Sequence, residues 1–507
     1  MNVTSEGVAP AAGSEKALAL QNAVKLALSL AATLVVAFSV RVFIPRFLGP
    51  AAFGQLHFAE SFATTVFVFT VLGIDVYIRK EVATRIEHAN DFFVGVLVVR
   101  GALSLGMLAL MAPLLWAMGK SEVEWRLAYL FAGWQMAFVL NNTLAALLHA
   151  RGTIDGLAVI NTGMKLLWAV GVGGALFLRG GAEAVALVFF VSEALKSVVL
   201  LRSVRNCLGV TLRLDLGATR AVLWSSAPFF IHYLAHQIYA RVDVQMLSVL
   251  TADSEVGWYG AAANLALAGM LLLPVVNAVV LPMGARLREE SEEAMNEAMR
   301  QAVRLVMVGG ALVALLLFLY APALVRLCFG EGFESAARTL QILAPMFPLT
   351  YVAVLTSLHL IQLGRVWTVT KISLVGLALN PVLNLFSIPA GWELLGDGGA
   401  GVGAAAASVV TELVITAVML VALGRAAVDR SVLRTALRVL LLSGCVVAVH
   451  VLLAPLGVLR APLEIAVFVL GGTGLGIVPL GEIAGLVGSA LTRRRSGEAA
   501  TTEKENH

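Results

Sequence analysis

Charged residues are scarce in this sequence of 507 residues: Asp, Glu, Lys and Arg together make up only 13% of it. A soluble globular domain carries roughly 25% charged residues, so the composition argues against a chain of soluble domains. Apolar residues instead reach 59%, and the mean hydropathy is +0.89. The formal net charge is only +4, and the excess of basic residues lies in short loops, so we do not interpret it as a nucleic-acid surface.

Cysteine is nearly absent, with only Cys207, Cys328 and Cys445 in the chain. These three are far apart and form no CxxC pair, which argues against a disulfide framework and against a metal cluster. The features of a secretory signal peptide are also lacking, because residues 1–18 are polar and contain no basic segment followed by a short apolar stretch. We therefore expect the first apolar run to be a retained helix.

Long apolar runs follow one another from about residue 20 to about residue 490. Each is close to the ~20 residues that a helix needs to cross ~30 Å of hydrocarbon. The pattern predicts an all-α polytopic membrane protein of about fourteen transmembrane helices. The predicted spans are residues 20–44, 55–78, 92–116, 125–149, 156–178, 183–205, 221–250, 256–284, 302–324, 337–363, 366–389, 399–423, 435–455 and 461–489.

Lys and Arg are distributed unequally between alternate loops. The loops after even-numbered spans, together with the C-terminal tail, hold 21 of these residues, and the loops after odd-numbered spans hold 7. Because cytoplasmic loops are enriched in Lys and Arg, both termini are predicted to face the cytoplasm. The segment 286–301 is charged and amphipathic and is predicted to form a surface helix, and the polar tail from Arg493 is predicted to be disordered.

A short pattern occurs twice in the chain. Phe53-Gly54-Gln55-Leu56-x-x-Ala59 returns as Val256-Gly257-Trp258-Tyr259-x-x-Ala262, and the offset between Gly54 and Gly257 is 203 residues. Duplicated halves are typical of transporters, in which one half rocks against the other around a central site. The repeat therefore favours a transporter built from two related halves.

Ionisable groups inside predicted spans are the candidate functional residues, because each costs about 2.5–3.5 kcal/mol at bilayer depth. The span 221–250 is the richest, and its polar residues recur at helical spacing, so it is expected to face a watery cavity or other polar helices. Its candidates are His232, His236, Gln237, Tyr239, Arg241 and Asp243. The other spans contribute Arg41, Glu60, Lys165, Lys371 and Asn380.

A cavity lined by Arg41, Arg241, Lys165 and Lys371 would be cationic. Such a cavity suits anionic head groups, and the planar fork of arginine suits phosphate oxygens in particular. The alternative for Lys371, which is near the end of its span, is that it simply extends to the membrane interface.

Other polar residues also have simpler interpretations. His232 and His236 would need further ligands from other helices to bind a metal, so a cavity-lining role is favoured over a metal site. Asp75 lies close in sequence to Arg79, and an ion pair at a cytoplasmic helix end would explain both residues without a functional role.

Three segments resemble a known family. FIPRFLGPAAFGQLHFAESF (43–62) and VLGIDVYIRKEVA (71–83) contain Leu48-Gly49-Pro50, Gly73-Ile74-Asp75 and Arg79-Lys80-Glu81. These positions resemble the first two helices of bacterial polysaccharide-repeat flippases, the O-antigen and exopolysaccharide translocases of the multidrug/oligosaccharidyl-lipid/polysaccharide exporter superfamily. The segment RVDVQMLSVLTADSEVGWYGAAANL (241–265) is similar to the passage from the seventh to the eighth helix of this family.

This resemblance implies two pseudo-symmetric six-helix lobes and two further C-terminal helices. The corresponding divisions are an N-terminal segment 1–19, lobes at 20–205 and 206–424, helices thirteen and fourteen within 425–490, and a tail 491–507. It also implies that the chain flips an undecaprenyl-pyrophosphate-linked oligosaccharide from the cytoplasmic to the outer leaflet of the bacterial inner membrane, for surface polysaccharide assembly.

The resemblance and the polar pattern together suggest roles for individual residues. The residues expected to bind substrate are Arg41, Arg241, Lys165, Lys371, Gln237 and Asn380, with the two arginines on the phosphates. The candidates for coupling transport to H⁺ or Na⁺ are Glu60, Asp243, His232 and His236. Gly54 and Gly257 are candidates for a hinge at the lateral opening, although tight turns alone would also explain them.

The expected partners are the lipid-linked oligosaccharide, membrane lipids, and a polysaccharide polymerase with its chain-length machinery. We expect a monomer with no organic cofactor, no metal and no nucleic acid. The alternatives within the superfamily are a lipid II flippase and a drug/cation antiporter, the second of which would favour acidic cavity residues. The alternative from another class is a membrane enzyme acting on lipid-linked sugars, which is disfavoured because no large outward loop is predicted.

Overall fold

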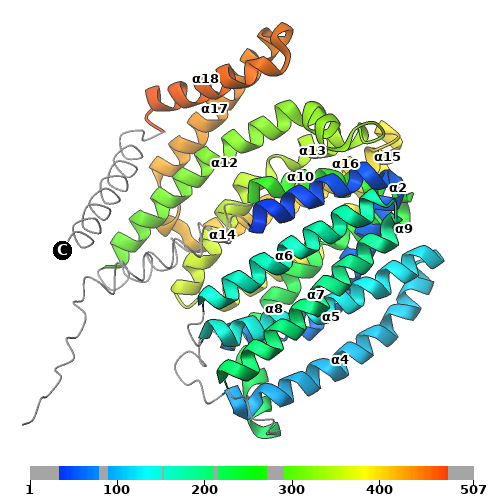
Figure 1. Ribbon diagram of the computed structural model, residues 1–507. Coiled ribbons are helices and arrows are strands. Elements are labelled where there is room, and N and C mark those ends of the chain that lie inside the picture. Colours follow the sequence, from blue (N-terminus) through cyan, green and yellow to red (C-terminus); the bar gives the residue numbers. More distant parts are fainter. Residues whose placement is uncertain (1–32, 79–88, 151–153, 209–214, 271–290, 478–507) are drawn as a thin grey trace, which may run out of the picture.

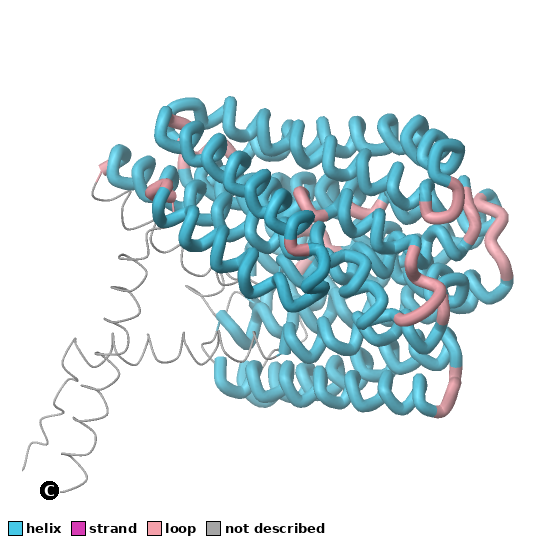
Figure 2. Tube along the Cα trace, turned by 90° about the horizontal axis from the view of Figure 1, so that it is seen from above, coloured by secondary structure: helices cyan, strands magenta, loops and turns pink. Residues whose placement is uncertain are grey.

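The computed structural model describes residues 33–78, 89–150, 154–208, 215–270 and 291–477, and the regular elements within these ranges are all helices (Figures 1 and 2). The first part of the chain forms a helix at 33–48, α2 (Pro50–Phe67), the 3₁₀ turn η1 (Val68–Thr70), α3 (Ile74–Tyr77), α4 (Ala89–Ala117), α5 (Glu122–Ala150), α6 (Ile154–Phe177) and α7 (Gly181–Leu208).

The second part of the chain follows the same plan. It forms α8 (Leu216–Tyr239), α9 (Val242–Leu250), α10 (Asp253–Ala266), η4 (Leu267–Met270), α12 (Glu292–Phe329), α13 (Ser335–Leu343), α14 (Met346–Gln362), α15 (Val366–Leu395) and α16 (Gly399–Leu423). After η5 (Gly424–Ala426) come α17 (Arg430–Leu452), η6 (Ala454–Arg460) and α18 (Ala461–Gly474).

These elements confirm the predicted fold class. Within the described ranges, ten helices are long and apolar enough to cross a membrane. The remaining elements occupy the other predicted spans, and several of them are shorter helices that succeed one another within one span. The chain is therefore a multi-pass, all-α membrane protein.

Two local predictions were wrong. The segment 286–301 does not form a separate surface helix. Its residues from Glu292 onward form the first turns of α12, which continues without interruption to Phe329. Ser291 caps this helix by accepting a hydrogen bond from the Ala294 backbone N–H at 3.0 Å. The span 221–250 is not one helix either, since α8 ends at Tyr239 and α9 begins at Val242.

The helices pack in two groups followed by a short C-terminal addition. In the first group α5 packs on α2 and α7, and α6 packs on α7; in the second group α15 packs on α8 and α16, and α14 packs on α12 and α16. In the described residues α17 and α18 pack on each other and on α12, and they lie at one edge of the molecule (Figure 1). This arrangement agrees with two lobes and two additional helices.

The two groups meet where α2 crosses α10, and the crossing is reciprocal. A Cβ atom on Gly54 would collide with the Asp253 carbonyl group, and a Cβ atom on Gly257 would collide with the Pro50 carbonyl group. Because 253 is 50 plus the repeat offset of 203, the two contacts exchange when the halves are exchanged, as contacts do across a two-fold axis. His57 contacts Gly260, its own counterpart under the same offset.

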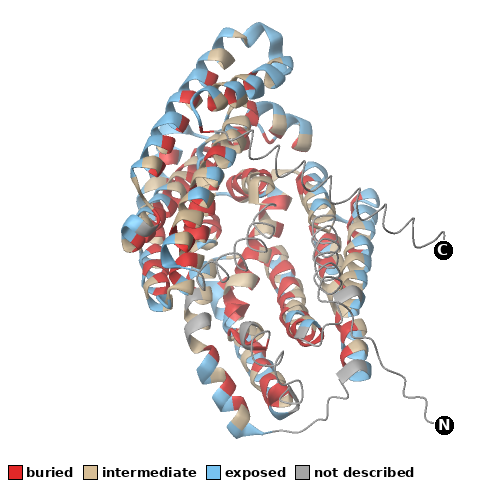
Figure 3. Ribbon diagram, turned by 90° about the vertical axis from the view of Figure 1, so that its left-hand side faces the viewer, coloured by how far each residue is buried: buried red, intermediate tan, exposed pale blue. Residues whose placement is uncertain are grey.

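Buried residues face the interior of each helix group, and the outward faces are exposed (Figure 3). The largest core combines side chains of α2, α5, α7, α10 and α13, including Phe58 and Phe131, with Phe333 from the connection between α12 and α13. Large apolar side chains also cover the outside, for example Val170 and Phe177 on α6, which are 74% and 87% exposed. An outer surface of this kind suits contact with lipid tails.

Further contacts join the two halves near both ends of the helices. Near residues 117–122, the Lys120 ammonium group donates a hydrogen bond to the Ser248 carbonyl oxygen at 2.7 Å. At the same end, the Gln55 amide donates to the Asp253 carboxylate at 2.9 Å. Toward the opposite end α3 and α4 pack on α8, where Gly73 lies against the backbone of α8.

Candidate functional site

A cavity of about 580 Å³ lies between the two helix groups. Its wall combines side chains from the helix 33–48, α2 and α5 with side chains from α8, α9, α10, α13, α14, α15 and α16. A volume of this order is typical of a ligand-binding site. The polar lining residues are Arg41, His57, Glu60, Ser61, Thr64, Gln135, Gln237, Arg241, Asp243, Asn264, Asn380 and Ser408.

Arg41 and Glu60 form an ion pair on the first half's side of the cavity. The two guanidinium nitrogens of Arg41 donate to the two carboxylate oxygens of Glu60 at 3.2 and 2.5 Å. The Arg41 guanidinium also lies 5.6 Å from the ring centre of Phe189 on α7. The side chains of Arg41 and Glu60 remain 30% and 18% exposed, so a ligand in the cavity can reach this pair.

Arg241 belongs to the other half and occupies the break between α8 and α9. It is the N-cap residue of α9, and its guanidinium group donates to the side-chain oxygen of Gln237. The break therefore presents a guanidinium group and the N-terminus of a helix, which carries a partial positive charge, at the same place in the cavity wall. Discontinuous helices at the membrane midplane are typical of transporter binding sites.

Asp243, in the first turn of α9, is the centre of a second polar cluster. Its carboxylate accepts hydrogen bonds from the Tyr259 hydroxyl at 2.9 Å, from the Asn384 amide at 2.7 Å and from the Ser408 hydroxyl. The Asn384 amide also donates to the Asn380 side-chain oxygen at 2.8 Å. Asp243 is only 3% exposed, and no Lys or Arg among the described residues forms a salt bridge with it.

An aromatic wall on α5 closes one side of the cavity. Trp134 and Phe138, one helical turn apart, stack with ring centres 5.5 Å apart and an interplanar angle of 27°. Trp134 also makes an edge-to-face contact with Phe189, with ring centres 6.1 Å apart. Gln135 lies between the two aromatic residues in sequence and lines the same cavity.

Several predicted site residues lie together in this cavity. Arg41, Glu60, Gln237, Arg241, Asp243 and Asn380 are all lining residues. These residues therefore lie around the same cavity. Their roles in binding substrate or in ion coupling stay predictions.

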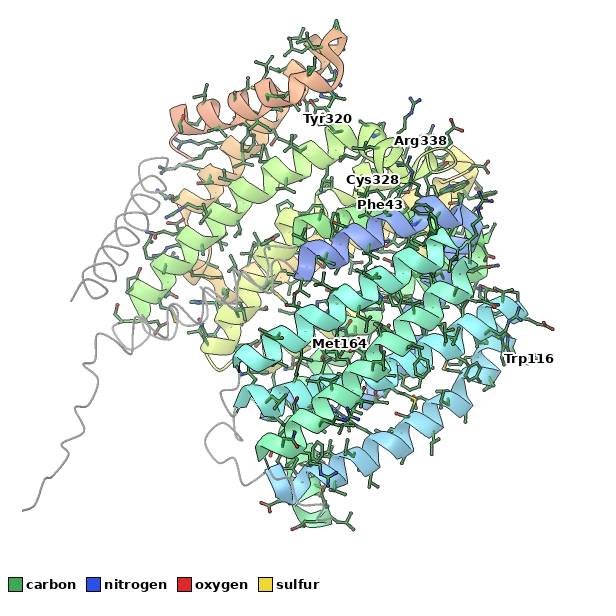
Figure 4. The ribbon with its side chains drawn as sticks, in the orientation of Figure 1. Phe43, Trp116, Met164, Tyr320, Cys328 and Arg338 are labelled. Carbon is green, nitrogen blue, oxygen red and sulfur yellow. The ribbon has the colours of Figure 1, made fainter. Side chains whose placement is uncertain are left out.

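The predicted lysines lie elsewhere. Lys165 places its ammonium group 3.8 Å from the ring centre of Trp168 on its own helix, α6, next to Met164 (Figure 4). Lys371 on α15 is exposed. Neither lysine is a lining residue of the cavity, where the two arginines lie together with Glu60 and Asp243. Lys165 is nevertheless close enough to interact electrostatically with Arg41 and Glu60, so its predicted role stays a prediction.

Two histidines and two glycines were also predicted as site residues. His236 stacks on Tyr239, with ring centres 5.2 Å apart, and is not a lining residue of the cavity. The side chain of His232 lies outside the part of the chain that the structure describes. Gly54 and Gly257 lie at the close crossing of α2 and α10, which gives a packing reason for glycine at both positions and leaves the hinge role as a prediction.

Buried polar residues outside the predicted set also appear. Arg100 on α4 is 5% exposed, lies 3.5 Å from the carboxylate of Asp75 and donates to the hydroxyl of Thr143. Asp75 thus has a partner in α4, whereas Arg79 lies outside the described residues. A single arginine in an otherwise apolar span was the available signal for this pair.

A further buried network joins the C-terminal helices to α12. Glu464 is 1% exposed and accepts hydrogen bonds from the Tyr320 hydroxyl at 2.8 Å and from His450 Nδ1 at 2.9 Å. Arg460 lies 3.6 Å from the same carboxylate, and Tyr320 is labelled on α12 in Figure 4. Because this network is remote from the cavity lining, we assign it to the attachment of α17 and α18.

Metal-ligating side chains do not gather in the described residues, since no group of three or more His, Cys, Asp or Glu is placed to hold a metal ion. The cavity therefore offers charge, hydrogen-bonding groups and aromatic faces. These are the elements of a binding site for a ligand that is both anionic and polar.

Two family profiles match the chain. The profile described as "Polysaccharide biosynthesis protein" matches residues 19–288, which is more than half of the sequence. The profile described as "MatE" matches residues 228–386. No curated protein sequence matches the chain significantly.

Solved structures share the fold. The lipid II flippase MurJ in an inward closed conformation is 14% identical with a TM-score of 0.69, and the match covers 89% of this chain and 98% of that one. An inward-facing multidrug resistance MATE family transporter of the MOP superfamily is 16% identical with a TM-score of 0.64, covering 79% and 98%. A MOP superfamily transporter from Pyrococcus furiosus is 17% identical with a TM-score of 0.55, covering 79% and 95%.

Proposed function

The chain belongs to the polysaccharide biosynthesis protein family, and from this membership and the cavity we propose that it flips a lipid-linked oligosaccharide across a membrane. The substrate is an undecaprenyl-pyrophosphate-linked repeat unit, and the direction is from the cytoplasmic to the outer leaflet of the bacterial inner membrane. The proposal is supported by the fold, which the chain shares with a lipid II flippase and with a MATE family transporter of the MOP superfamily.

One observation carries the proposal: Arg41 from the first half and Arg241 from the second half line the same cavity. Pyrophosphate is an anion whose oxygens accept hydrogen bonds, and arginine donates to such oxygens in a fixed fork. A bound pyrophosphate would therefore be held between the halves, where it is reached from either side when the halves rock.

The partition of the substrate follows from its chemistry. The pyrophosphate and the sugars are polar and would cross within the cavity, while the polyprenyl chain remains in the lipid that surrounds the apolar outer surface. Passage requires the contacts at the two ends to open in turn. At one end these include Lys120 with Ser248 and Gln55 with Asp253, and toward the other end they include the packing of α3 and α4 on α8.

The orientation proposed from the loop charges places both termini in the cytoplasm. It makes the end near residues 117–122 the outer end. A polysaccharide polymerase acting on the outer leaflet is then the partner expected to consume the flipped repeat unit.

The Asp243 cluster is the proposed coupling site for H⁺ or Na⁺. A buried carboxylate surrounded by neutral oxygens and amides can take up a cation, and its hydrogen-bond partners come from α10, α15 and α16. Binding a cation there would alter the packing of four helices beside the cavity. We predict that the variant Asp243→Asn, reconstituted in liposomes, retains substrate binding but no longer flips substrate faster when a proton or sodium gradient is applied. An unchanged response to both gradients would remove Asp243 from coupling.

The proposed function is tested by gene deletion and complementation. The deletion strain should accumulate lipid-linked repeat units on the cytoplasmic side of the inner membrane, and the wild-type gene should restore surface polysaccharide. Charge-reversed variants Arg41→Glu and Arg241→Glu should fail to do so, whereas Arg338→Glu, which changes an exposed arginine that does not line the cavity, should succeed. Full rescue by both cavity variants would contradict the proposal.

The same strain separates the alternatives. Accumulation of lipid II instead of repeat units would identify a lipid II flippase, and sensitivity to cationic drugs without accumulation would identify a drug antiporter. The drug antiporter stays an alternative because residues 228–386 match the MatE profile. A cationic drug would meet Glu60 already engaged by Arg41, which is why the oligosaccharide is preferred.

A further inference from the structure

Gln135 on α5 lines the central cavity and has a buried polar atom without a hydrogen-bond partner among the described residues. The residue is 3% exposed, and the atom without a partner is its side-chain oxygen. A buried acceptor without a partner costs free energy, so such atoms are rare unless a ligand or water satisfies them. The position of Gln135 therefore points to a ligand group that donates a hydrogen bond, such as a hydroxyl.

Two aromatic rings flank this oxygen along the helix. Trp134 and Phe138 line the same cavity and stack on each other at 5.5 Å, and Phe189 holds Trp134 from the side at 6.1 Å. The face of an aromatic ring carries partial negative charge. It therefore suits the C–H groups on the apolar face of a sugar ring, while the hydroxyl groups at the edge of that sugar can donate to a neighbouring amide oxygen.

The aromatic wall is next to one of the two arginines. Phe189 makes an edge-to-face contact with Trp134 and also lies 5.6 Å from the Arg41 guanidinium. A ligand with its anionic part at Arg41 would thus place the group next to that anion near Trp134. In a sugar joined to a lipid through pyrophosphate, this neighbouring group is the first sugar.

We propose that Trp134, Gln135 and Phe138 form a subsite for the sugar attached directly to the pyrophosphate, and this proposal rests on the proposed function. The three residues carry no charge, so the subsite takes a neutral pyranose. The sugar stacks on the aromatic wall, and one of its hydroxyl groups donates to the oxygen of Gln135.

The test compares two soluble probes on the purified full chain: farnesyl pyrophosphate and the same lipid carrying one glucose. Wild-type protein should bind the glucosylated probe about tenfold more tightly, the effect of one hydrogen bond and one aromatic contact. The variants Trp134→Ala and Gln135→Leu should lose most of this preference and bind the bare probe within about twofold of wild type.

Two further variants serve as controls. Trp134→Phe keeps an aromatic face and should keep most of the preference. Trp116→Ala removes a tryptophan that is 79% exposed on α4, a helix that contributes no lining residue to the cavity, and should leave the preference unchanged. Trp134 packs on Phe189, so Trp134→Ala also removes a structural contact. If that variant does not fold, Gln135→Leu, which is nearly isosteric, decides the question.

Each outcome is decisive. Equal affinity of the wild type for both probes, or a preference that survives both Trp134→Ala and Gln135→Leu, would overturn the sugar subsite while leaving the proposed function intact. If neither probe binds the wild type, the proposed function fails and the subsite fails with it.

Discussion

Replacing Arg41 by Gln should weaken the binding of a lipid pyrophosphate more than any substitution on the outer surface. The change removes one of the two guanidinium groups in the cavity, and it leaves Glu60 without the partner that now donates to both of its oxygens at 3.2 and 2.5 Å. The pyrophosphate then loses a donor and faces an uncompensated carboxylate.

The magnitude has two parts. A hydrogen bond to a charged group contributes about 1.5–3 kcal/mol. Repulsion between the ligand and Glu60 would add about 3 kcal/mol for charges about 6 Å apart at an effective dielectric constant of about 20. Because the side chains of Arg41 and Glu60 are 30% and 18% exposed, solvent screening reduces the second part. We take it as about 1 kcal/mol, so Arg41→Gln should weaken binding by about 100- to 1,000-fold.

The assay is equilibrium binding of farnesyl pyrophosphate to the purified protein in detergent, measured by calorimetry. Arg41→Lys keeps the charge but loses the planar fork, and its affinity should fall by about tenfold. The double variant Arg41→Gln/Glu60→Gln removes the repulsion and should bind several times more tightly than Arg41→Gln alone. Arg338→Gln provides the matched control, because it removes an exposed arginine outside the cavity.

Two results would refute this reasoning. If Arg41→Gln binds within twofold of wild type, the pyrophosphate does not contact Arg41. If the double variant binds more weakly than Arg41→Gln, Glu60 assists binding and does not compete for the arginine.

Two substitutions test the helix crossing between the halves and a buried ion pair within the first half. Gly54→Ala should lower the thermal unfolding midpoint, because the new Cβ meets the Asp253 carbonyl group and overpacking costs about 1–3 kcal/mol. Gly106 in α4 has open space around it, so Gly106→Ala should leave the midpoint unchanged or raise it. Equal shifts would contradict the close crossing. Lys120→Met should destabilise the protein by about 3 kcal/mol, because it leaves the buried carboxylate of Glu124, now 2.9 Å from the ammonium group, without its cation. A second change, Glu124→Gln, should recover part of the lost midpoint, and no recovery would show that the pair itself is not what Lys120 stabilises.

Some of the polar residues in the segment 221–250 lie around the cavity. Gln237, Arg241 and Asp243 all line it, because polar groups within an oily segment are tolerated only against other polar groups or water. The polar pattern of this segment gave no sign of the break between α8 and α9. Neither Gly nor Pro occurs at Ala240–Arg241, so the usual signals for the end of a helix were missing.

The aromatic wall could not be predicted in this way. Trp134 and Phe138 lie in an apolar span, and an apolar side chain in a membrane helix can face lipid, core or cavity with the same hydropathy. Lys165 shows the opposite difficulty: a charge inside a span suggested the cavity, but Trp168, one turn along the same helix, provides a local aromatic partner.

The reciprocal crossing of α2 and α10 has a consequence for the history of the chain. If the halves descend from one ancestral subunit that paired with itself, one glycine occupied both sides of the original contact. After duplication and fusion, positions 54 and 257 could mutate separately but still share one backbone crossing. Related sequences should therefore keep both residues small together. Positions 57 and 260, which hold His and Gly, mark a place where the two copies differ although they pack against each other.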